Sequence, residues 1–294
     1  MKTLKWFALA GFFIGVLIVD SARALEPGQS PPKRLYSLGD SATRAFNANL
    51  PFDNLNLSWV NGYYGFWERL FGLPNIKSHN QRITANFGGS DRRNWTAAQN
   101  GAEIDDMLSQ ASGVTGKNVT YTTVLLGAND ICRLSVTNPP TDAEVETEFR
   151  AGIDTLLNNL PNGATVQVVA IPDVARLHQV GLDKTALGIV DCPVVWTLTG
   201  SCPSVLSPGV SDMDLEFIRS RTIRYNEILE AVTKEKAEQH PGKFISSTDV
   251  SFTYPFGASE VSDIDCFHPS WRAQRVLSRE TWNAGPFQSH QAGN

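Results

Sequence analysis

Short apolar runs alternate with helical patterns along this 294-residue chain, and this alternation restricts the fold more than any other feature of the sequence. The runs predict strands at 35–38, 121–126, 166–171 and, more weakly, 244–250. Apolar residues at helical spacing predict helices at 61–73, 102–112, 143–160, 214–239 and 271–282. Strands that alternate with helices of this length predict an α/β fold with a mainly parallel sheet covered on both faces.

The N-terminus has the features of a secretory signal peptide. Lys2 and Lys5 precede an apolar run at 6–19, and the small-x-small sequence at 22–24 predicts cleavage after Ala24. A membrane anchor is the alternative, but the apolar run is shorter than the roughly 20 residues that span a bilayer. We therefore expect a secreted or periplasmic protein in which residues 25–294 form a single domain.

The mature chain is acidic, which argues against a nucleic-acid partner. Removal of residues 1–24 takes away three basic residues and one acidic residue, which leaves 22 Lys and Arg against 29 Asp and Glu, a net charge near −7. The sequence has no basic run of the kind that binds phosphates. It also lacks a cluster of ligand residues at metal-binding spacing, so we predict neither a metal nor another cofactor.

Four cysteines are expected to form two disulfides, because an even number in an exported chain favours pairing over metal binding: Cys132, Cys192, Cys202 and Cys266. The sequence does not decide how they pair. Residues 173–212 interrupt the alternation of strands and helices, and they hold two of the cysteines and two apolar runs. Because apolar content argues against disorder, we expect an ordered excursion over the functional site, with Cys192–Cys202 as one option for a link within it.

Three polar motifs lie where predicted elements begin or end. Gly-Asp-Ser at 39–41 follows the first strand, Gly-Ala-Asn-Asp at 127–130 follows the second, and Asp-Cys-Phe-His at 265–268 precedes the last helix. Each motif alone is equally well explained as a turn or a helix start. Together they supply a hydroxyl, an imidazole, a carboxylate and an amide, which are the parts of a serine hydrolase.

With these motifs the chain resembles the SGNH/GDSL hydrolase family. The family's blocks occur in order and span residues 35 to 284: Gly-Asp-Ser at 39–41, a lone glycine that we match to Gly101, Gly-x-Asn-Asp at 127–130, and Asp-x-x-His at 265–268. Gly88-Gly89 is a competing match for the lone glycine. The cysteines that follow Asp130 and Asp265 are similar to those of the phospholipase B-like branch.

The resemblance implies a three-layer α/β/α, flavodoxin-like sheet and a role for each motif residue. Ser41 would be the nucleophile, His268 its general base, and Asp265 the acid that orients the imidazole. The backbone N–H groups of Ser41 and Gly101 and the side-chain amide of Asn129 would form the oxyanion hole. There is no Gly-x-Ser-x-Gly elbow, which argues against the standard α/β-hydrolase arrangement.

The resemblance also implies the substrate class and one disulfide. We expect a monomeric ester hydrolase acting on lipid or acyl esters, as an esterase, a phospholipase A or B, or a lysophospholipase, with transient contact to a membrane surface. A disulfide between Cys132 and Cys266 would join two loops at the rim of the site. A carbohydrate deacetylase with the same site is one alternative, and a catalytically silent binding module on the same fold is the other.

Overall fold

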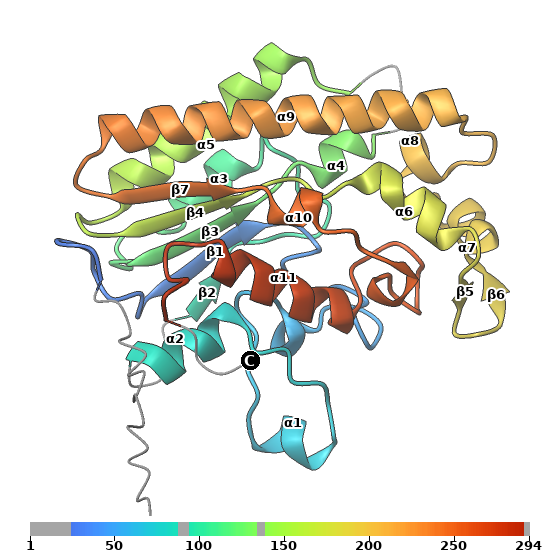
Figure 1. Ribbon diagram of the computed structural model, residues 1–294, viewed down its shortest axis with the longest axis horizontal. Helices are drawn as coiled ribbons and strands as arrows, with labels where there is room; N and C mark the ends of the chain where they lie inside the picture. Colours follow the sequence, from blue (N-terminus) through green and yellow to red (C-terminus); the bar gives the residue numbers. More distant parts are fainter. Residues whose placement is uncertain (1–24, 88–93, 134–138, 291–294) are drawn as a thin grey trace, which may run out of the picture.

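The fold is built on a five-stranded parallel sheet with the strand order β2-β1-β3-β4-β7 (Figure 1). The computed structural model describes residues 25–87, 94–133 and 139–290, so the predicted signal peptide and Gly88-Gly89 lie outside the described residues. The strands are β1 (Leu35–Gly39), β2 (Asn94–Thr96), β3 (Tyr121–Leu125), β4 (Thr165–Val169) and β7 (Phe244–Thr248). This is the flavodoxin-like order 2-1-3-4-5, and it confirms the predicted sheet.

Helices cover both faces of the sheet, which makes three layers (Figure 1). One face carries α3 (Met107–Ser112), α5 (Asp142–Asn159) and α9 (Asp212–Gln239), and the other carries α2 (His79–Phe87) and α11 (Trp271–Asn283). All residues of β1, β3 and β4 are consequently buried. Successive strand side chains point to opposite faces, so Leu38 packs into the core beneath α5 and α9, whereas Leu35 packs into the core beneath α11.

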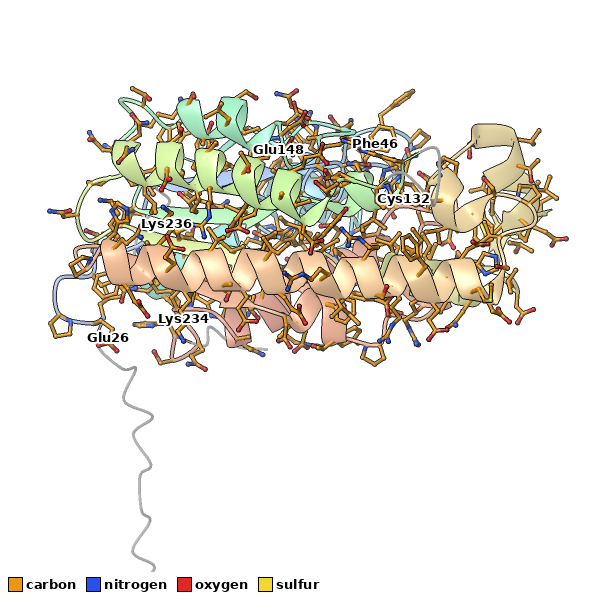
Figure 2. The ribbon with its side chains drawn as sticks, turned by 90° about the horizontal axis from the view of Figure 1, so that it is seen from above. Glu26, Phe46, Cys132, Glu148, Lys234 and Lys236 are labelled. Carbon is orange, nitrogen blue, oxygen red and sulfur yellow. A yellow bond between two sulfur atoms is a disulfide. The ribbon has the colours of Figure 1, made fainter. Side chains whose placement is uncertain are left out.

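The long helix α9 lies beside α5 along the length of the molecule (Figure 2). Arg150 of α5 forms a two-pronged ion pair with Glu235 of α9, at 2.9 and 2.7 Å. Lys236 of α9 lies 2.7 Å from Asp154 of α5. Within the described ranges, no helix is both long enough and apolar enough to cross a membrane.

Side-chain caps set where the main helices begin. Thr141 and Glu144 form a capping box on α5, and Ser211 and Asp214 form one on α9. Ser270 accepts from the N–H groups of Arg272 and Ala273 and starts α11, as its place ahead of the last helical pattern predicts.

Two predicted helices are shorter in the structure. The pattern at 61–73 forms only α1 (Phe66–Leu70), between Gly65 and Gly72, and its apolar side chains are exposed rather than packed. The pattern at 102–112 becomes helical only at Met107, and the Ile104 N–H ahead of it donates to the Asp130 carboxylate at 3.0 Å. The short strand β2 and helix α2 were not predicted.

The 173–212 excursion is ordered, as predicted. It consists of α6 (Val174–Gly181), the antiparallel hairpin β5 (Thr185–Ala186) and β6 (Val190–Asp191), α7 (Cys192–Thr199) and α8 (Pro203–Leu206). Its hairpin and α7 lie next to the C-terminal end of α6 (Figure 1).

Both predicted disulfide pairings were wrong. Cys132 bonds to Cys202, with their Cα atoms 4.3 Å apart, and Cys192 bonds to Cys266, with their Cα atoms 5.5 Å apart. Cys192 is the first residue of α7, and Cys202 lies three residues beyond its end, as the N-cap of α8; the helix between them spans about 12 Å, too far for a disulfide. The two bonds therefore fix the excursion to the rest of the domain instead of closing a loop within it.

Candidate active site

Ser41 lies in a tight turn at the C-terminal end of β1. Gly39 permits this turn, because a Cβ there would come within 2.2 Å of the Thr43 hydroxyl oxygen. The Asp40 carboxylate accepts the Ala42 N–H at 2.8 Å and so stabilises the turn. Burial raises the pKa of Asp40 to about 6.

The side chains of Ser41, His268 and Asp265 form a continuous hydrogen-bonded chain. Nε2 of His268 lies 2.9 Å from Oγ of Ser41, and Nδ1 of His268 lies 2.6 Å from Oδ2 of Asp265. Ser41 comes from the end of β1, whereas the other two come from the loop 261–269, called here the catalytic loop. The structure thus brings together the three residues that the motifs predict as nucleophile, base and orienting acid.

Asp265 is held in place by four donors. Its Oδ1 accepts the N–H groups of Phe267 and His268, each at 3.0 Å, and its Oδ2 accepts the Asn47 side-chain amide at 2.6 Å in addition to the imidazole. Burial opposes ionisation of Asp265, but these hydrogen bonds and the nearby imidazole outweigh it and hold the pKa of the carboxyl below its ordinary value. Asp265 is therefore ionised and oriented toward His268.

Two phenyl rings enclose the imidazole. The ring centroids of Phe46 and Phe267 lie 5.0 and 4.6 Å from that of His268, both in edge-on geometry. Neither Phe46 nor Asn47 carries a sequence signal, because both act through contacts with a loop more than 200 residues further along the chain.

The predicted oxyanion donors lie at neighbouring strand ends. Asn129 is in α4 (Ala128–Ile131), and its side-chain amide donates one hydrogen to the Ala102 carbonyl at 2.8 Å, which holds it beside the 101–102 turn. The Gln99 N–H donates to the Gly39 carbonyl at 3.1 Å and so places this turn alongside Ser41. Within the described residues, the N–H groups of Ser41 and Gly101 donate to no other group.

Gly101 is required for its backbone angle rather than for space. Its φ is +83°, in the region that favours glycine, while a Cβ would have no neighbour within 4 Å. Gly101 is exposed, and it does not line the pocket into which Ser41 opens.

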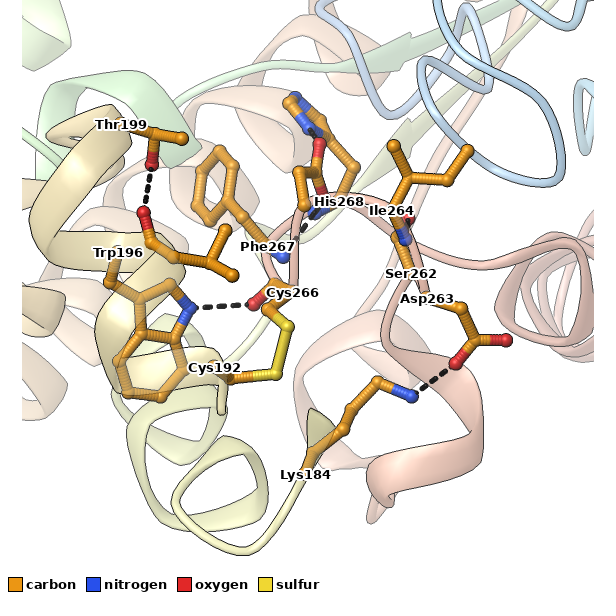
Figure 3. The surroundings of a disulfide bond; sticks show 12 residues. Lys184, Cys192, Trp196, Thr199, Ser262, Asp263, Ile264, Cys266, Phe267 and His268 are labelled. Atoms are coloured by element: carbon orange, nitrogen blue, oxygen red, sulfur yellow. Dashed lines mark hydrogen bonds and ion pairs between the residues drawn. A yellow bond between two sulfur atoms is a disulfide. The ribbon is translucent and has the colours of Figure 1, made fainter. Parts of the chain in front are cut away.

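The excursion braces the catalytic loop at four points, and Figure 3 shows those made by Cys192, Trp196 and Lys184. Cys192 at the start of α7 bonds to Cys266, and Nε1 of Trp196 donates to the Cys266 carbonyl at 2.8 Å. Lys184 forms an ion pair with Asp263 at 2.5 Å, and the Leu187 N–H donates to the Asp263 carbonyl at 2.8 Å. The position of Asp265 and His268 therefore depends on the excursion.

Ser41 and His268 open into a largely apolar pocket of about 130 Å³. It lies between α6, the segment 254–261 and α11. The apolar lining consists of Val174, Leu177, Val180, Phe256, Val261 and Leu277. The excursion contributes one wall of this pocket through α6, which agrees with its predicted place over the site.

No group of three or more His, Cys, Asp or Glu side chains in the described ranges is arranged to hold a metal ion. The remaining described histidines are not part of the site. His79, for example, is fully buried between Tyr121 and Thr281, and burial lowers its pKa to about 3.

The fold and the site together define an ester hydrolase. The family model described as GDSL-like Lipase/Acylhydrolase matches residues 35–281. The chain belongs to this family, as the motif blocks predict.

Solved structures with related folds have low sequence identity to this chain. An alpha/beta hydrolase enzyme from the metagenome of Lake Arreo, Spain, is 14% identical, with 90% of this chain and 99% of that one covered and a TM-score of 0.49. An extracellular lipase from Streptomyces rimosus is 16% identical and phospholipase A1 from Streptomyces albidoflavus NA297 is 15% identical; in each case 86% of this chain and 99% of the other are covered, with a TM-score of 0.43. A comparison with curated proteins found no match.

Proposed function

We propose that this protein is a secreted serine esterase that hydrolyses lipid or acyl esters through an acyl-enzyme. The observation that carries the proposal is the chain of two short contacts, 2.9 Å from Ser41 to His268 and 2.6 Å from His268 to Asp265, at the mouth of an apolar pocket. Two disulfides support an exported protein, since such bonds persist in oxidising compartments.

In the proposed reaction, Oγ of Ser41 attacks the ester carbonyl carbon while its proton passes to Nε2 of His268. The carbonyl oxygen becomes an oxyanion that accepts hydrogen bonds from the N–H groups of Ser41 and Gly101 and from the amide of Asn129. The bond to the alcohol oxygen then breaks, and His268 donates its proton to that oxygen. An acyl ester remains on Ser41.

Water completes the cycle in the second half of the reaction. It gives a proton to His268 and attacks the acyl carbon, and a second tetrahedral intermediate forms. The carbon–Oγ bond breaks, Ser41 recovers its proton from His268, and a carboxylic acid leaves. Asp265 stabilises the imidazolium in both halves and fixes its Nδ1–H tautomer.

The apolar pocket supports an acyl chain as the group bound beside Ser41, because burying aliphatic carbon there is favourable. The excursion also exposes large apolar side chains next to α6: Leu187, Ile189, Val194 and Leu198. We propose that this group, called here the excursion surface, makes transient contact with a lipid surface while the protein remains monomeric.

Paired substitutions test the lipid contact. Leu187→Ser with Ile189→Ser should reduce hydrolysis of phospholipid vesicles more than hydrolysis of a soluble short-chain ester. Phe66→Ser in α1 with Phe71→Ser just after it is the matched control, since this pair removes similarly exposed apolar side chains outside the excursion. If both pairs lower vesicle hydrolysis equally, the excursion surface has no special role.

A series of p-nitrophenyl esters from acetate to palmitate tests the substrate class. The proposal predicts turnover of medium and long acyl chains by wild type and none by Ser41→Ala. A sharp preference for acetate would instead favour the deacetylase alternative. Absence of turnover with every ester, together with no covalent labelling by a fluorophosphonate, would leave only the silent binding module.

A further inference from the structure

The substrate pocket contains one basic side chain with unused hydrogen-bond donors. Arg176, on the first turn of α6, lines the same pocket as Ser41 and His268. Among the described residues of that lining it is the only lysine or arginine. A permanent positive charge in a largely apolar wall needs an explanation, since a partly buried charge is costly unless it is paired.

Two hydrogen bonds hold Arg176 in position, one from its backbone and one from its side chain. Its N–H donates to the side chain of Asp173, which caps α6, at 3.3 Å. Its Nε donates to the Phe256 carbonyl across the pocket at 2.6 Å. The guanidinium is thereby fixed at its inner nitrogen, while the two terminal nitrogens remain outside these contacts.

The terminal nitrogens have no partner in the described part of the chain. No carboxylate lies within 4 Å of the Arg176 guanidinium there, and no acceptor is within hydrogen-bond distance of its terminal nitrogens. Asp173 is nearby, but its Oδ2 pairs with Nε of Arg219 at 2.8 Å. The planar fork of Arg176 is therefore free to bind an anion with two hydrogen bonds.

We propose that Arg176 forms a subsite for an anionic group of the ester substrate, a phosphodiester or a carboxylate. This inference rests on the proposed ester-hydrolase function and names the substrate class more closely. The anion would bind the two terminal nitrogens while the ester carbonyl lies against Ser41. Apolar side chains such as Leu177, one residue further along α6, would pack against the aliphatic part of the same molecule.

Glu260 limits which anions fit. It also lines the pocket, and only one of its oxygens is used, to accept the Gly257 N–H at 3.0 Å. A carboxylate here repels a group with two negative charges, whereas it tolerates one negative charge and favours a zwitterion with an ammonium group. The subsite thus fits a phosphodiester better than a phosphomonoester.

Short-chain substrates matched in acyl length test the subsite below their micelle concentrations. The phosphodiester pair is dihexanoyl phosphatidylcholine and dihexanoylglycerol, and the carboxylate pair is the mono-p-nitrophenyl ester of glutaric acid and p-nitrophenyl valerate. Arg176→Gln should lower kcat/KM for one or both anionic members about 10- to 100-fold relative to the neutral members, mainly through KM. Arg176→Lys, which keeps the charge but loses the fork, should fall between.

Loss with phosphatidylcholine alone places the anion in the head group, and loss with the glutarate ester alone places it in the acyl part. Arg224→Gln is the control, because it removes an equal charge from the exposed face of α9 and should leave the ratios unchanged. If Arg176→Gln lowers kcat/KM equally for the charged and neutral esters, or for none of them, the proposed subsite is wrong. If wild type hydrolyses none of the four substrates, that result would instead count against the proposed function.

Discussion

The side-chain amide of Asn47 donates to Oδ2 of Asp265 over 2.6 Å, although 218 residues separate them in the sequence. Asn47 has a φ of +52°, and its own side-chain oxygen accepts the Phe52 N–H at 2.8 Å. The Ser262 hydroxyl, at the base of the catalytic loop, donates to the Asn47 carbonyl at 2.6 Å. Asn47 therefore joins the loop after Ser41 to the loop that carries Asp265 and holds the carboxylate ionised.

Asn47→Ala should lower kcat about 10-fold with little change in KM, because a hydrogen bond to a charged group is lost. The pKa of Asp265 should rise, so activity should be lost at a higher pH on the acid side of the pH–rate profile. Asn54→Ala is the control, since Asn54 binds the same loop through Leu50 and Phe52 without touching Asp265. The same loss and the same pH profile in both variants would mean that Asn47 acts only by ordering its loop.

Asn129→Ala should reduce kcat about 100- to 1000-fold while substrate binding changes little, because one of three oxyanion donors is removed. The amide also binds the Ala102 carbonyl, so stability should fall by about 1 kcal/mol. Kinetics with p-nitrophenyl esters and thermal unfolding measure the two effects separately. A loss of activity below about fivefold would exclude Asn129 from the oxyanion hole.

Removal of the Cys192–Cys266 disulfide should impair catalysis beyond its effect on stability. The double variant Cys192→Ala/Cys266→Ala removes this bond, whose cysteines are 74 positions apart. Its counterpart Cys132→Ala/Cys202→Ala removes a bond between cysteines 70 positions apart. Because the two loops are of similar length, each variant should lose about 4 kcal/mol of stability. Only the first pair anchors the catalytic loop, and kcat per folded molecule should fall further in it.

Trp196→Phe provides a milder test of the same brace. It removes the donor to the Cys266 carbonyl and keeps a ring against Gly181, where a Cβ would lie 2.3 Å from the indole. We expect a lower kcat with nearly unchanged KM. Full activity in this variant and equal kcat in the two disulfide variants would show that the catalytic loop holds its shape without the excursion.

Asp130→Asn should change how stability depends on pH. Burial, and then repulsion from Glu103, raise the pKa of Asp130 to about 7 in the folded protein, above the ordinary value of 3.8. The folded state keeps a proton that the unfolded state has lost, so this residue's contribution to stability falls as pH rises from about 4 to 7, by at most about 1.4 kcal/mol per pH unit.

Asparagine does not titrate, so the free energy of unfolding of the Asp130→Asn variant should decline less as pH rises. The difference in stability in favour of the variant should therefore be largest at pH 8. Urea unfolding at several pH values measures this difference. A difference between variant and wild type that stays constant from pH 4 to 8 would contradict the raised pKa of Asp130.

The sequence predicts the reacting side chains well because their motifs are local. Gly-Asp-Ser places Ser41 at the carboxyl end of β1, and Asp-x-x-His places Asp265 and His268 in the loop ahead of α11, where their side chains meet that of Ser41. The other four strands of the sheet, but not β2, were predicted for the same reason, since strands in a covered parallel sheet appear as short apolar runs.

Contacts between distant segments were not predictable from such patterns. Asn47, Trp196 and Arg176 have no motif, and their roles depend on which loops meet in three dimensions. The disulfide pairing failed because the helix between Cys192 and Cys202 separates two residues that are close in sequence. Exposed apolar residues on α1 repeat at helical spacing without a core to pack against, so the same pattern overestimated that helix.

The most direct test of a Ser41-dependent acyl-enzyme is intact mass measurement after incubation with a fluorophosphonate, for wild type, Ser41→Ala and Ser37→Ala. Ser37 lies in β1 four residues before Ser41 and is buried away from the pocket. Wild type and Ser37→Ala should each gain one phosphonyl adduct at Ser41 and lose ester hydrolysis, whereas Ser41→Ala should gain none and be inactive from the start. Stoichiometric labelling of Ser41→Ala, or ester hydrolysis by it at the wild-type rate, would contradict the proposed mechanism.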